Sequence, residues 1–341
     1  MKAPQAACVF CLATLAATTA AWWPYGREVP RGIRTERAVT VAGHGKAVVL
    51  YPSIWPAARP VLPEFEPITS ASLSYDDSTL LVVLTNRGQC KAYPFQELHF
   101  QELTLDEIAG QNFLLTYCGM TYSPVVFVSS SSVGVETLAD SGTIHEANLV
   151  LRDGLTGSYW QQISGECLSG KLVGTRLRIW PCRFASLGEL RASGLNALVM
   201  RPAERRRDAG RMLPSGVSES GNDEPDYPIT RFAPLLPAKE RVLGFLLDGQ
   251  GVAVPLGLLS TGSVTGQAHG RTFRVVSELG FYRVEASSKH GWIRLDIQPC
   301  FWFAWQLLHP ELLVWPMPNM QDNLPLPGRI IGRESRSVDH D

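Results

Sequence analysis

The strongest constraint on the fold is one continuous stretch, residues 112–128, with the sequence NFLLTYCGMTYSPVVFV. An apolar run leads into Cys118, a short turn follows, and a second apolar run leaves the turn. Apolar runs of this length without alternation are typical of strands that are buried on both faces. We therefore expect two central strands with the rest of the chain packed around them, and Cys118 becomes the first candidate for a functional residue.

Length and composition permit a large folded core. The chain has 341 residues, of which 45% are hydrophobic and 18% are charged, with a formal net charge of -1. This balance is typical of a globular protein and argues against wholesale disorder. The only strong basic run, residues 205–207, is flanked by Glu204 and Asp208. Because nucleic acid binding needs a concentrated basic surface, we interpret this run as part of a solvated linker and expect no nucleic acid partner.

The first 21 residues are typical of an export signal. Lys2 is followed by the apolar run 6–17 and by small residues at 18–21, which is the pattern of a cleavable signal peptide. The alternative is that Trp22 and Trp23 extend the run into an uncleaved membrane anchor. We expect an exported protein, periplasmic or extracellular, with membrane contact only through such an anchor.

Turn and strand signals predict a β-rich chain of the α+β class. A hairpin is expected over residues 80–93, because β-prone runs flank the turn Asn-Arg-Gly. Helices are expected at 95–109 and near 186–192, and strands at 47–51 and 148–151. The resulting division is a signal peptide or anchor (1–21), an extended N-terminal arm (22–70), a first lobe (71–200), a polar linker (201–227), a second lobe (228–316) and a C-terminal tail (317–341).

The second lobe resembles a shortened copy of the first. Residues 88–94 match 249–255 at an offset of 161 (255 minus 94), and 110–113 match 270–273 at an offset of 160 (270 minus 110). Two later matches follow in the same order, namely Pro181-Cys182 with Pro299-Cys300 and Leu198-Val199 with Leu313-Val314. Their order favours an internal duplication in which the second copy has lost part of its middle. Glu278 then stands where Cys118 stands in the first copy.

Five cysteines remain if the leader is removed, because two of the seven lie within it. None of them forms a Cys-x-x-Cys pair or a metal-type spacing, so buried thiols or a single disulfide are the first expectation. Cys182 and Cys300 occupy matching places in the two lobes. They are therefore the candidates for a disulfide between the lobes.

One ordered set of residues resembles the pattern of a known family. The set is Ala92-Tyr93-Pro94, Glu102, Asp106, Gly110, Thr116-Tyr117-Cys118, Leu149-Val150, Asp153, Thr156, Ser158, Trp160 and Gln162. It resembles the bacterial and archaeal domain of unknown function 3179, and the likeness covers residues 65–315, including residues 238–244 and 301–305 of the second lobe. The resemblance implies a cysteine-centred site and brings no established activity.

The chain departs from that family pattern at the turn. Gln101 stands where the family has a histidine, and His99 lies two residues earlier. Thr121 stands where the family has a second cysteine, and Gly119 replaces a proline. Two thiolates at Cys-x-x-Cys spacing can hold a soft metal or cycle as a disulfide, which one cysteine and a threonine cannot do in the same way. The resemblance therefore implies a degenerate copy of the site.

The candidate site residues surround Cys118, which is the candidate catalytic nucleophile or ligand. The alternative is a buried strand-end cysteine, and nearby carboxylates favour it because they would raise the pKa of the thiol. On a helix, His99 and Glu102 would share a face and could bind a metal with Cys118, although a solvated helix face is the alternative. A ligand pocket beside the turn would be lined by His99, Gln101, Glu102, Asp106, Thr121, Asp153, Trp160 and Gln162. Turn stabilisation by Asp153 and core packing by Trp160 are the alternatives for those two residues.

We therefore expect two related lobes of short-stranded sheet with a few short helices, the second lobe reduced. The first hypothesis for function is a non-enzymatic exported module that binds a small molecule or an envelope protein at the degenerate site. The alternative is a metal-binding or thiol-dependent (redox) activity centred on Cys118, and a third hypothesis is a structural envelope protein. No cofactor is identified, and a metal ion is the only candidate.

Overall fold

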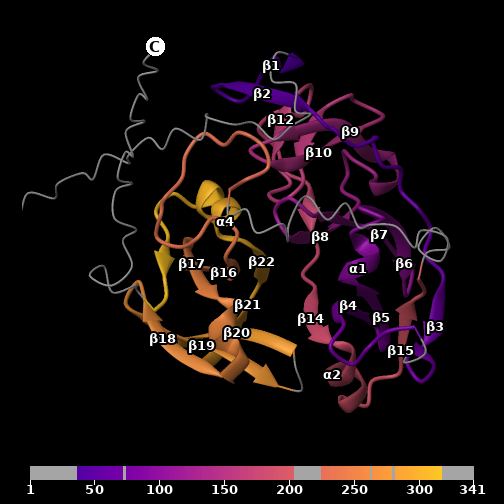
Figure 1. Ribbon diagram of the computed structural model, residues 1–341, viewed down its shortest axis with the longest axis vertical. Helices are drawn as coiled ribbons and strands as arrows, with labels where there is room; N and C mark the ends of the chain where they lie inside the picture. Colours follow the sequence, from indigo (N-terminus) through magenta and orange to yellow (C-terminus); the bar gives the residue numbers. More distant parts are fainter. Residues whose placement is uncertain (1–36, 72–73, 203–223, 262, 279–280, 317–341) are drawn as a thin grey trace, which may run out of the picture.

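The computed structural model describes residues 37–71, 74–202, 224–261, 263–278 and 281–316 (Figure 1). The predicted signal peptide and C-terminal tail lie outside the described residues, as does most of the predicted linker. The described residues form five β-sheets and a few short helices, which confirms the prediction of a β-rich chain. None of the helices in these ranges is long and apolar enough to cross a membrane.

The first sheet is built on the predicted hairpin. β4 (Leu80–Asn86) and β5 (Gln89–Pro94) pair antiparallel about Arg87 and Gly88, which both have positive φ angles. A two-residue turn of this kind matches the twist of a hairpin, and glycine adopts the left-handed backbone without steric cost. The order is β14-β4-β5-β15-β3, with β14 (Arg183–Ser186), β15 (Ala197–Met200) and β3 (Phe65–Pro67). α2 (Leu187–Ala192) connects β14 to β15, close to the predicted helix.

The second sheet carries the cysteine turn. Its order is β13-β8-β7-β6, with β6 (Leu103–Ile108), β7 (Gln111–Cys118), β8 (Ser123–Val128) and β13 (Arg178–Ile179). All residues of β8 are buried, as are the residues of β7 after Asn112. The prediction of two strands buried on both faces is therefore confirmed.

The helix predicted over residues 95–109 is wrong for most of its length. α1 covers only Phe95–Leu98, and β6 begins at Leu103. Ala109 and Gly110 have positive φ angles and connect β6 to β7 in a second tight hairpin. Pairing with the strongly apolar β7 outweighs the weak intrinsic helix preference of this segment.

The third sheet joins the N-terminal arm to the segment between β8 and β13. Its order is β1-β2-β9-β10-β11-β12, with β1 (Val39–Ala42), β2 (Ala47–Pro52), β9 (Leu138–His145), β10 (Asn148–Asp153), β11 (Tyr159–Gln161) and β12 (Cys167–Ser169). A short 3-10 helix, η3 (Val135–Thr137), leads into β9. The described part of the arm therefore supplies β1 and β2 to this sheet and β3 to the first sheet, and does more than lie over the first lobe.

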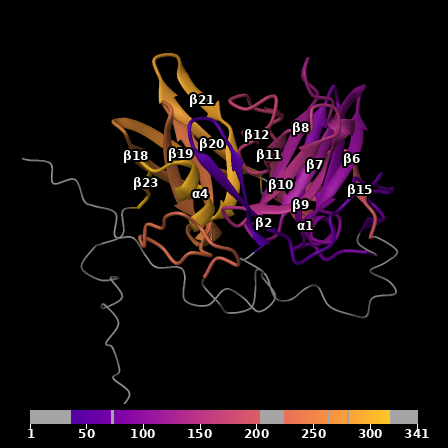
Figure 2. The same cartoon turned by 90° about the horizontal axis from the view of Figure 1, so that it is seen from above.

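The second half of the chain forms the two remaining sheets. One has the order β22-β16-β17-β23, with β16 (Arg241–Leu247), β17 (Gln250–Pro255), β22 (Ile297–Phe301) and β23 (Leu313–Val314). The other has the order β18-β19-β20-β21, with β18 (Val264–Ala268), β19 (Arg271–Glu278), β20 (Phe281–Ser288) and β21 (Gly291–Leu295). The helical elements are η4 (Leu256–Thr261) after β17 and α4 (Trp302–Leu308) between β22 and β23. Figure 2 shows β18 to β21 on one side of the molecule and β6 to β8 on the other.

The two halves share strand order and register. The order β14-β4-β5-β15 corresponds to β22-β16-β17-β23, and β13-β8-β7-β6 corresponds to β21-β20-β19-β18. Leu81 pairs with Pro94 and Val242 pairs with Pro255, so both partners are displaced by 161 (242 minus 81). In the second half, only residues 289 and 290 connect β20 to β21. The corresponding connection in the first half, from β8 to β13, contains β9 to β12. The third sheet is therefore what distinguishes the first half from the second.

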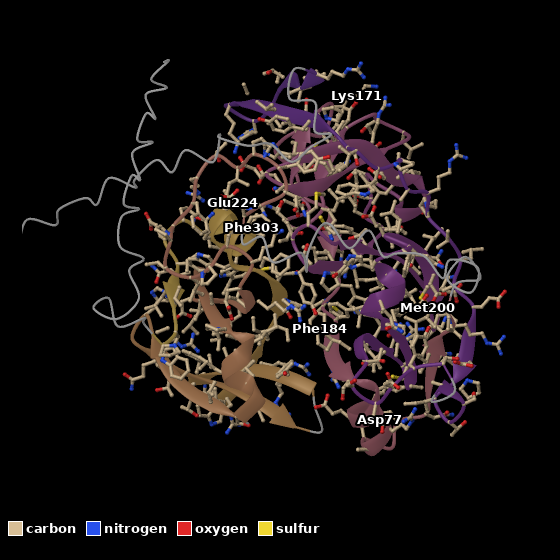
Figure 3. The ribbon with its side chains drawn as sticks, in the orientation of Figure 1. Asp77, Lys171, Phe184, Met200, Glu224 and Phe303 are labelled. Atoms are coloured by element: carbon tan, nitrogen blue, oxygen red, sulfur yellow. The ribbon has the colours of Figure 1, made fainter. Side chains whose placement is uncertain are left out.

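The two halves pack on each other through β8 with β22 and through β14 with β20. One hydrophobic cluster contains buried residues of both halves, including Tyr117 and Phe127 from the first and Phe301 and Trp302 from the second. Phe184 of β14, labelled near the centre of Figure 3, belongs to this cluster. The halves consequently share one core, and the cysteine turn lies within it.

Candidate functional site

Cys118 is the last residue of β7 and pairs with Ser123, the first residue of β8. Residues 119–122 form the turn between them. The side chain of Cys118 is only 1% exposed, and its Sγ accepts a hydrogen bond from the backbone N–H of Leu149 at 3.4 Å. The thiol is therefore enclosed between the second and third sheets.

A buried polar network surrounds the turn, and Gln162 is its centre. The Nε2 of Gln162 donates to Thr116 Oγ1 at 2.9 Å and to the carbonyl oxygen of Ser123 at 2.9 Å. Its Oε1 accepts from Ser123 Oγ at 3.1 Å and from Asn148 Nδ2 at 2.9 Å. Thr121 completes the network, because its Oγ1 accepts from Asn148 Nδ2 at 3.0 Å and lies 2.7 Å from Ser123 Oγ. All five side chains are at most 1% exposed, so the network is a closed part of the core.

The electrostatic environment keeps Cys118 protonated. Burial raises the pKa of the Cys118 thiol to about 11, and the nearby carboxyl group of Glu102 also raises it. Hydrogen bonds from Thr121 and Leu149 act in the opposite direction and are outweighed. A reactive cysteine needs a lowered pKa and access to solvent, and Cys118 has neither.

Native Cys118 is expected to resist alkylation. At pH 8, iodoacetamide should modify it at least ~100-fold more slowly in the folded protein than in the urea-unfolded chain, because only the opened state exposes the thiol. Peptide mass spectrometry after timed labelling measures both rates. Fast modification of the folded protein would show that the thiol is accessible and would restore it as a candidate nucleophile.

The residues before β6 lie near Cys118 but not on one helix face. His99 directly follows α1, and its ring centroid is 5.4 Å from that of Tyr117. A Cβ at Gly119 would lie 3.2 Å from the His99 ring. The absence of a side chain at Gly119 therefore leaves room for the imidazole beside the turn. The Oε1 of Gln101 is buried without a hydrogen-bond partner.

Glu102 is the second titratable group near the thiol. Burial, together with the neighbouring carboxyl group of Asp140, raises its pKa to about 7. Asp140 is itself held by backbone N–H groups, from Ala58 at 2.8 Å and from Gly142 at 2.8 Å. The structure therefore places a pair of carboxyl groups beside the turn, of which the sequence indicated only Glu102.

Asp106 and Asp153 lie away from the turn and have structural partners. Asp106 forms an ion pair with Lys91 at 2.8 Å and accepts a hydrogen bond from the Tyr93 hydroxyl at 2.7 Å. Asp153 accepts from Trp160 Nε1 at 3.0 Å and from the side chain of Thr156 at 2.7 Å. The eight residues predicted to line one pocket thus divide among separate environments. For Asp153 and Trp160 the contacts agree with the structural alternatives.

Within the ranges that the structure covers, no three His, Cys, Asp or Glu side chains form a group that could hold a metal ion. The predicted set of His99, Glu102 and Cys118 is therefore not assembled as a three-ligand site. Coordination would require three such side chains to converge on one point.

The predicted disulfide between Cys182 and Cys300 is wrong, because both cysteines are free. The strand registers show that the two cysteines do not occupy matching places in the two halves. Cys300 pairs with Val242, whereas Leu81, the counterpart of Val242, pairs with Ala185. Ala185, not Cys182, therefore occupies the place of Cys300 in the first half.

The second half covers the cysteine turn. The backbone N–H of Phe301 donates to the carbonyl oxygen of Thr121 at 2.8 Å. The ring centroids of Tyr122 and Phe301 are 5.5 Å apart, and the Arg241 guanidinium lies 4.5 Å from the Tyr122 ring centroid. The turn is therefore closed by contacts that join the halves.

A cavity of about 930 Å³ lies at a different place, between the third sheet and the second half. Its buried floor comes from β8, β16 and α4 and from residue 163 of the loop after β11, and contains Val125, Ile163, Phe245 and Trp305. A Cβ at Gly244 would lie 2.4 Å from the Trp305 indole, so this glycine allows the ring to lie directly against β16. A cavity of this size is sufficient for a small organic ligand.

Charged and polar side chains form the rim of the cavity. The cations are Lys46, Arg176, Arg231 and Arg294, and both His145 and His309 contribute to the lining. None of the nine residues predicted at the cysteine turn lines this cavity. Sequence reasoning missed the cavity because its lining comes from elements far apart in the chain.

The fold and its sites define a β-rich protein with a closed cysteine turn and a separate cavity between its third sheet and its second half. The family model described as protein of unknown function (DUF3179) matches residues 52–294, which is more than half of the chain. The chain therefore belongs to this family, as the resemblance predicted. No curated protein and no solved structure matches the chain.

Proposed function

We propose that this protein is a non-enzymatic binding module whose ligand site is the cavity between the third sheet and the second half. The observation that carries the proposal is the separation of two environments. The only predicted nucleophile, Cys118, is 1% exposed, whereas an open cavity of about 930 Å³ combines a buried aromatic floor with a charged rim. Apolar cavities with a few convergent polar groups are the usual form of small-molecule sites.

The thiol-dependent alternative has less support. Nucleophilic or redox chemistry at Cys118 would require a thiolate, and the pKa of this thiol is raised to about 11 by burial and by Glu102. The hydrogen bonds of Thr121 also leave it fully engaged in the core, at the position where the family has its second cysteine. We therefore assign the cysteine turn a structural role within the proposed binding module.

A fragment screen by protein NMR tests the binding function. Amide signals of Gly244, Phe245 and Gln298 are expected to shift on addition of aromatic and aliphatic fragments at millimolar concentration, because these residues line the cavity. The Cys118→Ala variant should bind the same fragments, since Cys118 lies outside the lining. Fragment-induced shifts confined to residues 119–122, or loss of fragment binding in Cys118→Ala, would show that the ligand binds at the cysteine turn and not in the cavity.

The binding module is proposed to act outside the cytoplasm, which rests on the leader-like sequence of residues 1–21 alone. Its partner would be a small molecule in that compartment. N-terminal sequencing of the protein recovered from a secreting host tests this proposal. A retained residue 1 in a soluble cytoplasmic product would argue against export.

The two halves are proposed to derive from one duplicated unit. The strand orders correspond except for the additional β3 of the first half, and this correspondence and the displacement of 161 in both paired strands support this origin. Because the lining of the cavity comes from both halves, the complete cavity would have arisen only after the duplication. Superposition of residues 80–118 on 241–278 provides the check, and divergent backbone paths would contradict the proposal.

A further inference from the structure

The cavity has two chemically different parts. Phe245 and Trp305 in its floor are 1% and 4% exposed, and Val125 and Ile163 extend the same apolar surface. Arg176 and Arg231 lie at the end where α4 terminates, together with His309. A ligand that lies along this floor therefore meets apolar side chains along its body and the group Arg176, Arg231 and His309 at the end of α4.

The charged end is electropositive at the position of His309. Burial, together with the guanidinium groups of Arg176 and Arg231, lowers the pKa of His309 to about 4. The imidazole is consequently neutral at pH 7, and its ring centroid is 4.2 Å from that of Trp305. His309 thus stands between the floor and the two cations.

Three carboxylates belong to the rim, namely Glu146, Glu166 and Asp296, and Asp296 interacts electrostatically with Arg294. Glu166 forms an ion pair with Arg176 at 3.4 Å, and Glu146 accepts a hydrogen bond from the backbone N–H of Thr230 at 2.8 Å. The Arg231 guanidinium donates to the carbonyl oxygen of Gln306 at 3.3 Å. Arg176 retains a side chain that is 65% exposed, so its remaining N–H groups are accessible to a ligand.

Trp305 also has an unused hydrogen-bond donor. Its Nε1 is buried and has no hydrogen-bond partner, although the side chain forms part of the cavity lining. Buried polar groups without a partner cost free energy, so the indole N–H is a donor that the described residues leave unsatisfied.

On the basis of the binding function proposed above, we propose that the cavity binds an amphiphilic monocarboxylate. The carboxylate faces Arg176 beside His309, and the apolar body lies along Phe245 and Trp305. Guanidinium groups bind carboxylates through charge-assisted hydrogen bonds, whereas a neutral head group of the same size gains less there. The apolar floor would select against small hydrophilic anions.

A matched pair of probes tests this inference. Calorimetric titration of the full chain with decanoate and with decanol, at low ionic strength, is expected to give about tenfold tighter binding of decanoate, the effect of one charge-assisted hydrogen bond. Arg176→Gln should weaken decanoate binding about tenfold and change decanol binding less than twofold. The control is Arg178→Gln, because Arg178 is also exposed, lies two residues along the chain and is outside the cavity lining. It should leave both affinities unchanged.

A histidine NMR titration supplies a second readout that does not depend on the stability of a variant. Saturation with decanoate should raise the pKa of His309, because the bound anion offsets the two guanidinium groups, and decanol should leave it unchanged. Equal affinities for the two probes, or no change of the His309 pKa, would overturn the monocarboxylate inference while leaving the cavity as a binding site. If neither probe nor any fragment shifts the cavity amides, the proposed function itself fails.

Discussion

Replacing Gln162 by leucine is expected to destabilise the protein by about 3 to 5 kcal/mol, since each buried polar group left unpaired costs about 1 to 3 kcal/mol. The substitution removes the two donors and the acceptor through which Gln162 connects Thr116, Ser123 and Asn148. Those partners are buried and have no access to water in the folded state. Urea denaturation of the wild type and the variant, monitored by circular dichroism, gives the difference directly.

Two further variants make this prediction specific to the network. Gln111→Leu changes an exposed glutamine at the start of β7, and its effect should remain within about 0.5 kcal/mol. The double variant Asn148→Leu with Gln162→Leu should cost less than the sum of the single variants, because each single change leaves unpaired groups that the double change removes. Additive costs, or a Gln162→Leu cost no larger than that of Gln111→Leu, would show that the network does not stabilise the fold.

Glu102→Gln is expected to stabilise the protein at pH 8 and to have little effect near pH 4.5. The folded pKa of Glu102 is about 7, raised by burial and by Asp140 from its ordinary value of 4.5. Between these two values the folded state binds a proton that the unfolded state has lost, so stability falls as pH rises through this window. Above pH 7 the carboxylate is ionised in both states and its burial is unfavourable. The gain from the neutral amide should then be about 2 to 3 kcal/mol.

Denaturant titrations at several pH values between 4.5 and 8 measure this gain. Glu107→Gln is the matched control, because Glu107 is an exposed glutamate in strand β6 and its replacement should change the free energy of unfolding by no more than about 0.5 kcal/mol. A Glu102→Gln variant that loses stability equally at both ends of the range would contradict the prediction. Such a result would mean that the Glu102 side chain is required as a hydrogen-bonding carboxyl group.

Local patterns predicted the hairpins and the central strands correctly. The turn at Gly88 and the apolar run ending at Cys118 need only nearby residues to define them, because two-residue turns and buried strands have strong local signals. The segment 95–109 was misassigned, because Glu, Gln and Leu have little preference for the extended state on their own. Its pairing with β7 is non-local and decides the outcome.

The candidate site was predicted in part. The sequence correctly indicated that the fold converges on Cys118, and the structure connects Gln162 to Thr121 of the turn through Ser123 and Asn148. It could not show that the turn is closed, because the closing contacts come from the second half of the chain. The predicted pairing of Cys182 with Cys300 is wrong for a related reason. The register places Ala185, three residues after Cys182, at the position that matches Cys300, and a Pro-Cys match in the sequence does not reveal this difference.

By itself the sequence determined the β-rich class, the family and the position of the cysteine turn. Strand periodicity, turn residues and family motifs are local signals, because each depends only on residues that are close together in the chain. Only the tertiary structure decided that Cys118 is a protonated core residue and that the cavity lies elsewhere. The cavity floor combines Val125, Phe245 and Trp305, which are separated by up to 180 positions (305 minus 125). Burial, pKa and cavity shape arise from such long-range packing, which no local pattern specifies.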